Sequence, residues 1–253
     1  MKGTRLGTLL AALGGLGLFV GTAAAQPSTT AELINELNGK LLYIAIPITL
    51  LVEVILIYTV LRFKDSDEAQ PTKENRRLEI TWTVATAIIL VFVGVASYGV
   101  LASEDVTFTG DDIAPNEGDV HVEAVAYQWN WDMNYPQENV SALTANDVDH
   151  PRTQGIEGPI LLVPAEQDVY ITVTSRDVIH AIHVPELGLK QDAVPGQENT
   201  IKTHPLEPGV YQGYCAEYCG VSHSQMYFQM VVVPQDDYDA IMENQSGGSN
   251  SSE

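Results

Sequence analysis

Basic residues are scarce in this sequence, and their scarcity excludes several kinds of partner. Lysine and arginine together number 12 against 33 aspartates and glutamates, so the formal net charge is −21 at pH 7. Of these residues, 25 acidic but only four basic ones lie after Leu101. A region this acidic excludes binding to nucleic acid or to an anionic membrane surface. With two lysines, it resembles the solvated surface of a protein from a high-salt habitat, and a docking surface for a basic partner is the alternative.

Cysteine and histidine are also rare, and their positions exclude further classes. The two cysteines are Cys215 and Cys219, so none stands near residue 25, where a lipoprotein anchor would need one. All six histidines lie after Leu101, so the apolar runs before it have no imidazole to hold a haem. A haem bound by histidine within the membrane would therefore have to belong to another chain.

The first 25 residues have the features of a secretory signal peptide. Lys2 and Arg5 precede an apolar run over residues 6–20, and alanines at 23–25 provide an A-x-A cleavage site. An uncleaved first membrane helix is the alternative.

Two further apolar runs, residues 41–61 and 80–101, are each long enough to cross a bilayer core of about 30 Å. The segment that joins them holds five of the 12 basic residues, namely Arg62, Lys64, Lys73, Arg76 and Arg77. The positive-inside rule places this segment in the cytoplasm. We therefore predict a transmembrane helix hairpin over residues 26–101 of a multi-pass protein of the cell membrane, with the rest of the chain on the extracytoplasmic side.

Glu53 stands near the middle of the first run, where a carboxylate is costly in lipid and should face protein. A polar contact with a partner helix is favoured over a proton-handling role.

Residues 102–238 have the pattern of a small all-β domain. Apolar and polar residues alternate over 121–126, 169–174 and 226–233, with proline and glycine turns between them. Short strands over this length predict an antiparallel sandwich or barrel. The polar tail at 239–253 is predicted to be disordered.

Residues 214–226, Y-C-A-E-Y-C-G-V-S-H-S-Q-M, gather soft metal ligands in one short segment. Two thiols (Cys215 and Cys219), an imidazole (His223) and a thioether (Met226) suit copper better than a hard cation. Two cysteines four residues apart can place their sulfurs in one loop and bridge a pair of copper ions. A disulfide is the alternative, but its ring would be very short and it would leave His223 and Met226 unexplained.

A further ligand must come from elsewhere, and D-V-I-H-A-I-H-V-P at 177–185 offers His180 and His183. Side chains alternate between faces along a strand, so two histidines three positions apart cannot both face one site. One of the two is predicted to be a ligand.

These motifs resemble those of a known family. C-A-E-Y-C-G-V-S-H-S-Q-M and D-V-I-H with V-P-E-L-G-L-K-Q-D-A-V-P-G are similar to the binuclear copper-A segments of subunit II of haem-copper cytochrome c oxidases. The resemblance implies a two-helix membrane anchor followed by a cupredoxin-like Greek-key β-barrel. The copper ligands that it implies are His180, Cys215, Cys219, His223, the weak axial ligand Met226 and the backbone carbonyl of Glu217.

The resemblance also implies roles for residues that do not bind copper. Trp129 in Y-Q-W-N-W matches the tryptophan through which electrons enter, although core packing is the alternative for such aromatics. Glu79 matches a glutamate at the entrance of a proton channel into subunit I, and an interfacial acid beside Arg76 and Arg77 is the alternative. The carboxylate of Glu217 matches a ligand of Mg2+ or Mn2+ shared with subunit I.

The function implied is that of subunit II of a terminal oxidase. It accepts electrons one at a time from cytochrome c or a small blue-copper protein and passes them to haem in subunit I, where oxygen is reduced to water. The alternative is a membrane-tethered copper-binding electron carrier or copper chaperone.

Overall fold

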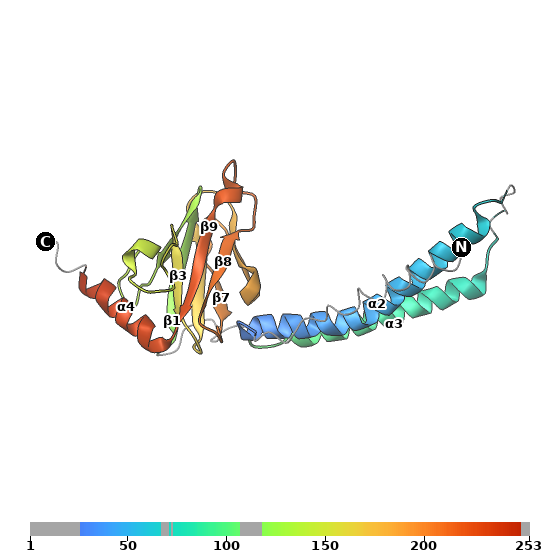
Figure 1. Ribbon diagram of the computed structural model, residues 1–253, viewed down its shortest axis with the longest axis horizontal. Coiled ribbons are helices and arrows are strands. Elements are labelled where there is room, and N and C mark those ends of the chain that lie inside the picture. Colours follow the sequence, from blue (N-terminus) through green and yellow to red (C-terminus); the bar gives the residue numbers. More distant parts are fainter. Residues whose placement is uncertain (1–25, 67–70, 72, 107–117, 249–253) are drawn as a thin grey trace, which may run out of the picture.

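The computed structural model describes residues 26–66, 71, 73–106 and 118–248. A pair of long helices extends from one end of a β-sandwich, and a further helix lies on the opposite side (Figure 1). The predicted signal peptide lies outside the described residues.

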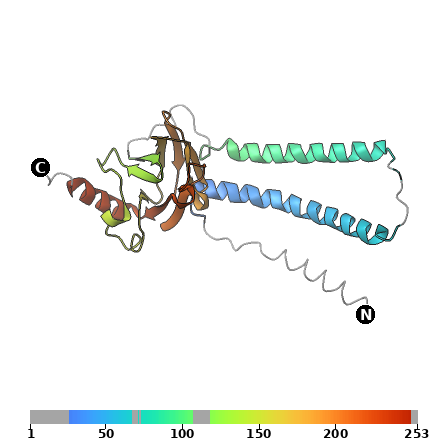
Figure 2. The ribbon, with the colours of Figure 1, turned by 90° about the horizontal axis from the view of Figure 1, so that it is seen from above.

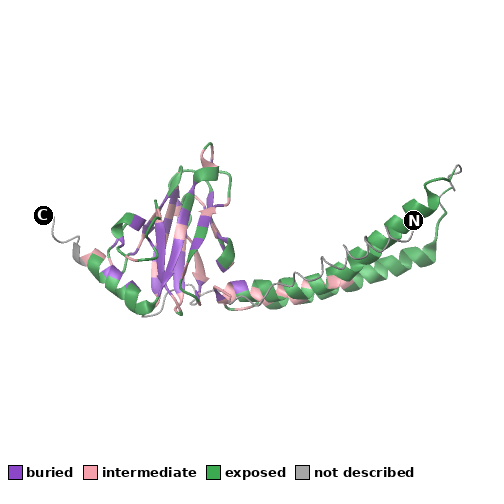
Figure 3. Cartoon of the chain, viewed as in Figure 1, coloured by how far each residue is buried: buried purple, intermediate pink, exposed green. Residues whose placement is uncertain are grey.

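Helices α2 (Thr29–Phe63) and α3 (Arg76–Leu101) form the hairpin, and both are long and apolar enough to cross a membrane. Each begins at a side-chain cap: Ser28 Oγ accepts from the Ala31 N–H at 3.1 Å, and Asn75 Oδ1 accepts from the Leu78 N–H at 3.2 Å. Figure 2 shows both helices extending away from the sandwich and diverging with distance from it. Most residues of the two helices are exposed, whereas most of the buried residues lie in the β domain (Figure 3).

Helix α2 begins well before the predicted span 41–61 because its first turn packs on the β domain. Ala31 is buried, and Ser28 Oγ donates to the Leu187 carbonyl at 2.7 Å. The Leu206 N–H donates to the Pro27 carbonyl at 2.9 Å. Gly188 has a φ of +66°, which favours glycine, and a Cβ there would lie 2.9 Å from Ile34 Cδ1. These contacts join the membrane anchor to the domain.

The domain has two sheets. The first has the strand order β2-β1-β4-β7, with β1 (Val120–Tyr127), β2 (Asn130–Asn134), β4 (Val169–Ser175) and β7 (Asn199–Thr203). The second has the order β3-β9-β8-β5-β6, with β3 (Ile160–Pro164), β9 (Tyr227–Val233), β8 (Gly209–Cys215), β5 (His180–Val184) and β6 (Leu189–Ala193). Strands β1 and β4 are parallel, as are β3 and β9, and the other pairs are antiparallel. Three short 3-10 helices lie between strands: η3 (Ala145–Asp147), η4 (Pro185–Leu187) and η5 (His223–Gln225).

The core lies between the two sheets. On β1, buried residues alternate with partly exposed ones, and Val120, Val122, Ala124 and Ala126 point inwards. The two apolar helices followed by a β-sandwich confirm the predicted fold class of a membrane-anchored, cupredoxin-like all-β chain.

The predicted disordered tail is wrong for residues 239–248. Helix α4 spans Gln235–Gly248, and its residues Tyr238, Ile241 and Met242 are buried. Ile241 and Met242 lie one turn after Tyr238, so the three side chains form an apolar stripe that packs on the sandwich. The polar composition of the segment concealed this stripe. Residues 249–253 lie outside the described residues.

Candidate metal centre

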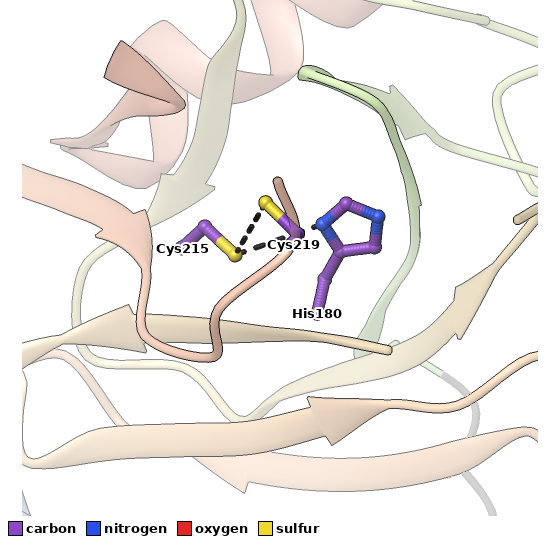
Figure 4. A group of neighbouring side chains, drawn as sticks. All are labelled: His180, Cys215 and Cys219. Atoms are coloured by element: carbon purple, nitrogen blue, oxygen red, sulfur yellow. Dashed lines mark hydrogen bonds between the residues drawn. The ribbon is translucent and has the colours of Figure 1, made fainter. Parts of the chain in front are cut away.

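Three buried side chains from separate parts of the domain form a cluster. His180 begins β5, Cys215 ends β8, and Cys219 lies in the loop between β8 and η5. Their ligand atoms all lie within 4.8 Å of one another (Figure 4). The cluster could hold a metal ion, because sulfur and imidazole nitrogen converge at one buried point.

The loop between β8 and β9 adds further donors to this cluster. Cys219 Sγ lies 3.6 Å from His223 Nδ1 and 3.8 Å from Met226 Sδ. Cys215 Sγ lies 3.6 Å from His180 Nδ1 and 3.2 Å from the backbone carbonyl of Glu217. Each of the six predicted copper ligands therefore has an atom at the cluster. Glu217 is exposed, and it contributes its backbone carbonyl to the cluster.

The two thiols are free in this structure. Their sulfur atoms are 3.8 Å apart, well beyond the S–S bond of about 2.05 Å in a disulfide. Burial, with the neighbouring Cys215, raises the pKa of the Cys219 thiol to about 12. At neutral pH the free thiol therefore keeps its proton, and a metal ion must displace that proton to bind the sulfur.

A carboxylate fixes the orientation of His180. Nε2 of this ring lies 2.9 Å from Asp177 Oδ1, and the edge of Trp131 contacts the ring at a centroid distance of 6.3 Å. Burial alone would raise the pKa of Asp177, but hydrogen bonds from His180, Gln128 and Val178 outweigh it and lower the pKa. An ionised carboxylate only accepts hydrogen bonds, so Nε2 carries the hydrogen and Nδ1 is left for a metal.

His183, the other candidate, does not join the cluster. It pairs with Tyr214 across β5 and β8, and the two rings stack at 5.1 Å. His183 lines an open cleft of about 620 Å³ with Lys190 and Tyr227. Burial, together with the charge of Lys190, lowers its pKa. The strand alternation thus separates the two histidines, and His180 is the one beside the thiols.

Trp129 lies at the turn between β1 and β2, directly against the loop that carries the thiols. Its indole N–H donates to the Cys219 carbonyl at 3.2 Å, and the Gln128 side-chain amide donates to the same oxygen at 2.7 Å. Because 37% of Trp129 remains exposed, the residue connects the protein surface to the cluster.

Glu79 is not near this centre. It lies in the first turn of α3, at the end of the hairpin far from the β domain (Figure 1). The structure therefore separates the candidate proton residue from the candidate metal centre by the length of the helix.

Sequence reasoning missed Asp177 and Gln128. Their contacts join residues that are far apart in the chain: Gln128 reaches Cys219, and the Gln128 backbone N–H donates to Asp177 Oδ2 at 2.7 Å. The signal in the sequence was that Asp177 stands three residues before His180. That spacing of an aspartate and a histidine is too common to predict a hydrogen bond.

The donor set fits copper. Two thiols, two imidazoles and a thioether gathered at one cluster are soft and borderline ligands, whereas Mg2+ or Ca2+ would require oxygen atoms.

Comparisons with known proteins show which family this chain is similar to. Residues 120–233 match the model of the cytochrome c oxidase subunit II periplasmic domain, and residues 16–100 match that of the transmembrane domain. A cytochrome c oxidase subunit 2 from Cereibacter sphaeroides is 32% identical over 90% of this chain and 82% of its own length. A probable cytochrome c oxidase subunit 2 from Rickettsia bellii is 33% identical over 84% of this chain and 79% of its own. The crystal structure of the periplasmic domain of subunit II from Bradyrhizobium japonicum is 31% identical, with a TM-score of 0.45, and covers 53% of this chain and 97% of that one.

Proposed function

The chain belongs to the cytochrome c oxidase subunit II family, and we propose that it accepts electrons at a binuclear copper-A centre held by His180 and the 214–226 loop. The observation that carries the proposal is the distance of 3.8 Å between two free, buried thiols, each with an imidazole nitrogen 3.6 Å away. Cys215, Cys219, His180 and His223 would hold the two ions, and Met226 and the Glu217 carbonyl would complete the ligand set.

Bound copper supplies a redox couple that takes up one electron at a time. The protein contributes a dry, preformed pocket, because Cys215, Cys219, Met226 and His180 are all buried. Preformed ligands reduce the rearrangement that accompanies each electron.

Electrons enter at Trp129 and leave toward haem in subunit I. The exposed part of the indole faces the donor, and its N–H contacts the carbonyl of Cys219. Trp129 keeps its N–H proton, so the step moves an electron alone. The donor is a one-electron carrier, cytochrome c or a small blue-copper protein.

The remaining roles concern the partner subunit. The exposed Glu217 carboxylate binds Mg2+ or Mn2+ at the contact with subunit I. The five basic residues around the hairpin loop place that loop in the cytoplasm and the copper domain outside. Glu79 then lies at the cytoplasmic entrance of a proton channel. Glu79→Gln should slow oxidase turnover while copper reduction stays normal, and unchanged turnover would remove this role.

A free copper carrier or chaperone is the competing function. The matches to both the membrane and the periplasmic models of an oxidase subunit argue against it. Purification from the native membrane tests this directly, because an oxidase subunit is recovered with haem and a carrier is recovered alone.

Replacement of single ligands tests the copper centre. Cys219→Ser removes a bridging thiolate and should abolish the delocalised electron in the EPR spectrum, because a serine hydroxyl is a poor copper ligand. Met226→Leu should retain both ions with a changed potential. An unaltered spectrum in Cys219→Ser would contradict the assignment.

A further inference from the structure

Asp177 contacts two parts of the electron path at once. It stands in the short turn between β4 and β5, three residues before His180. Its Oδ1 accepts from His180 Nε2 at 2.9 Å and from the Val178 N–H at 2.6 Å. Its Oδ2 accepts from the Gln128 backbone N–H at 2.7 Å.

The second contact holds the turn that carries Trp129. With its backbone tied to Asp177, Gln128 places its side-chain amide on the Cys219 carbonyl, beside the indole N–H. Gly220 makes room for both donors, because a Cβ there would lie 3.1 Å from Gln128 Nε2 and from Trp129 Nε1. The φ of Gly220 is +122°, which also favours glycine.

We propose that Asp177 is a positioning residue for electron transfer, which sets the tautomer of His180 and holds Trp129 against Cys219 through Gln128. The inference rests on the proposed copper function. One carboxylate thereby fixes a metal ligand and the point of electron entry relative to each other.

The chemistry of the carboxylate explains why an amide cannot replace it. All of the groups that face Asp177 are hydrogen-bond donors: His180 Nε2, the Val178 and Gln128 backbone N–H groups, and the Ser175 hydroxyl at 3.4 Å from Oδ1. An asparagine has one oxygen and one NH2 group in place of the two carboxylate oxygens. Its NH2 group would therefore face an N–H donor, either of His180 or of Gln128. If the NH2 faces His180, the hydrogen moves to Nδ1, which then cannot bind metal. The corresponding substitution in the Ser-His-Asp triad leaves the geometry intact but produces the wrong tautomer.

The electron balance needs nothing beyond the donor. One electron leaves the reduced donor, whose metal is oxidised by one unit, and the copper pair is reduced by one unit. No bond forms or breaks at Trp129 or Asp177.

The test compares Asp177→Asn and Asp177→Glu with Asp149→Asn in the full chain, purified in detergent and loaded with copper. Asp149 is exposed, so Asp149→Asn makes the same chemical change and removes the same charge at another site. The readouts are copper affinity, the EPR spectrum, the midpoint potential, and reduction by ascorbate and by cytochrome c.

Asp177→Asn should weaken copper binding about 10- to 100-fold, the usual effect of losing a hydrogen-bond partner of a ligating histidine, and should change the EPR hyperfine pattern. Reduction should slow with both donors, because the defect lies within the protein. Asp177→Glu keeps an acceptor-only group and should return the spectrum toward that of the unmodified chain. Asp149→Asn should match the unmodified chain throughout.

Two results would overturn the inference. A normal spectrum and potential in Asp177→Asn, with slow reduction by cytochrome c alone, would show that Asp177 serves only to dock the donor. Equal spectral changes in the Asn and Glu variants would show that the acceptor chemistry does not matter. Failure of the unmodified chain to bind two coppers would instead overturn the proposed function, so the two failures are distinguishable.

Discussion

The membrane hairpin and the β-sandwich differ in the burial of their apolar residues. In the described part of α2 and α3, no residue of the apolar spans is buried, whereas the apolar residues of the strands pack between two sheets. The sandwich therefore buries its apolar residues within one chain. The hairpin is completed only by lipid and neighbouring membrane proteins, because no water-soluble state would tolerate so much exposed apolar surface.

The candidate chemistry follows the same division. The thiols, the imidazoles of His180 and His223, and Trp129 all lie in the sandwich, and the hairpin contributes none of them. The contacts of Ser28 and Pro27 with the domain set where the candidate metal centre lies relative to the hairpin. We therefore propose that the sandwich accepts the electrons and that the hairpin sets its position at the membrane.

The largest effect within the sandwich is expected at Trp129. Trp129→Ala should slow reduction by a protein donor about 100-fold at unchanged copper content, because the residue positions electron entry but does not bind metal. Stopped-flow reduction and a copper assay measure the two quantities separately. Normal reduction kinetics in this variant would show that the indole serves only packing.

Substituting one glycine in each region tests the difference in packing between the sandwich and the hairpin. Gly213 on β8 is buried, and a Cβ there would overlap the Phe228 ring, whereas a Cβ at Gly94 on α3 would meet nothing within 4 Å. Gly213→Ala should cost about 3 kcal/mol of domain stability through overpacking. Gly94→Ala should leave the thermal unfolding of the domain unchanged.

In the assembled oxidase, the Gly94→Ala variant also tests whether a partner helix packs against α3. If a partner helix packs closely there, Gly94→Ala will weaken assembly without affecting copper. A domain that tolerates Gly213→Ala with an unchanged melting temperature would contradict the packing described for β8 and β9.

The smallest effect concerns the acidic surface, which we propose to be an adaptation to high salt. The Debye length falls from about 10 Å at 0.1 M to about 3 Å at 1 M salt, so repulsion among the 25 acidic residues after Leu101 is screened. The melting temperature of the domain should rise by a few degrees over this range. A domain most stable in dilute buffer, with reduction by a basic cytochrome that collapses as salt is added, would indicate a docking surface instead.

Local patterns predicted much of this molecule. The apolar spans and the soft-ligand segment were readable because each depends on neighbouring residues, and strand alternation implied that only one of His180 and His183 could be a ligand. The early start of α2 and the helix at the C-terminus were not readable, because Ala31 and Tyr238 are buried by distant parts of the chain. The role of Asp177 was hidden for the same reason, since Gln128 reaches it across 49 residues.

The most direct test of the account is a copper count with an EPR spectrum on the domain alone, residues 102–253, beside the full chain in detergent. The account predicts two coppers per molecule in both samples, with one unpaired electron shared equally by the two ions. A single copper with a mononuclear spectrum, or a pair that forms only when the hairpin is present, would contradict it.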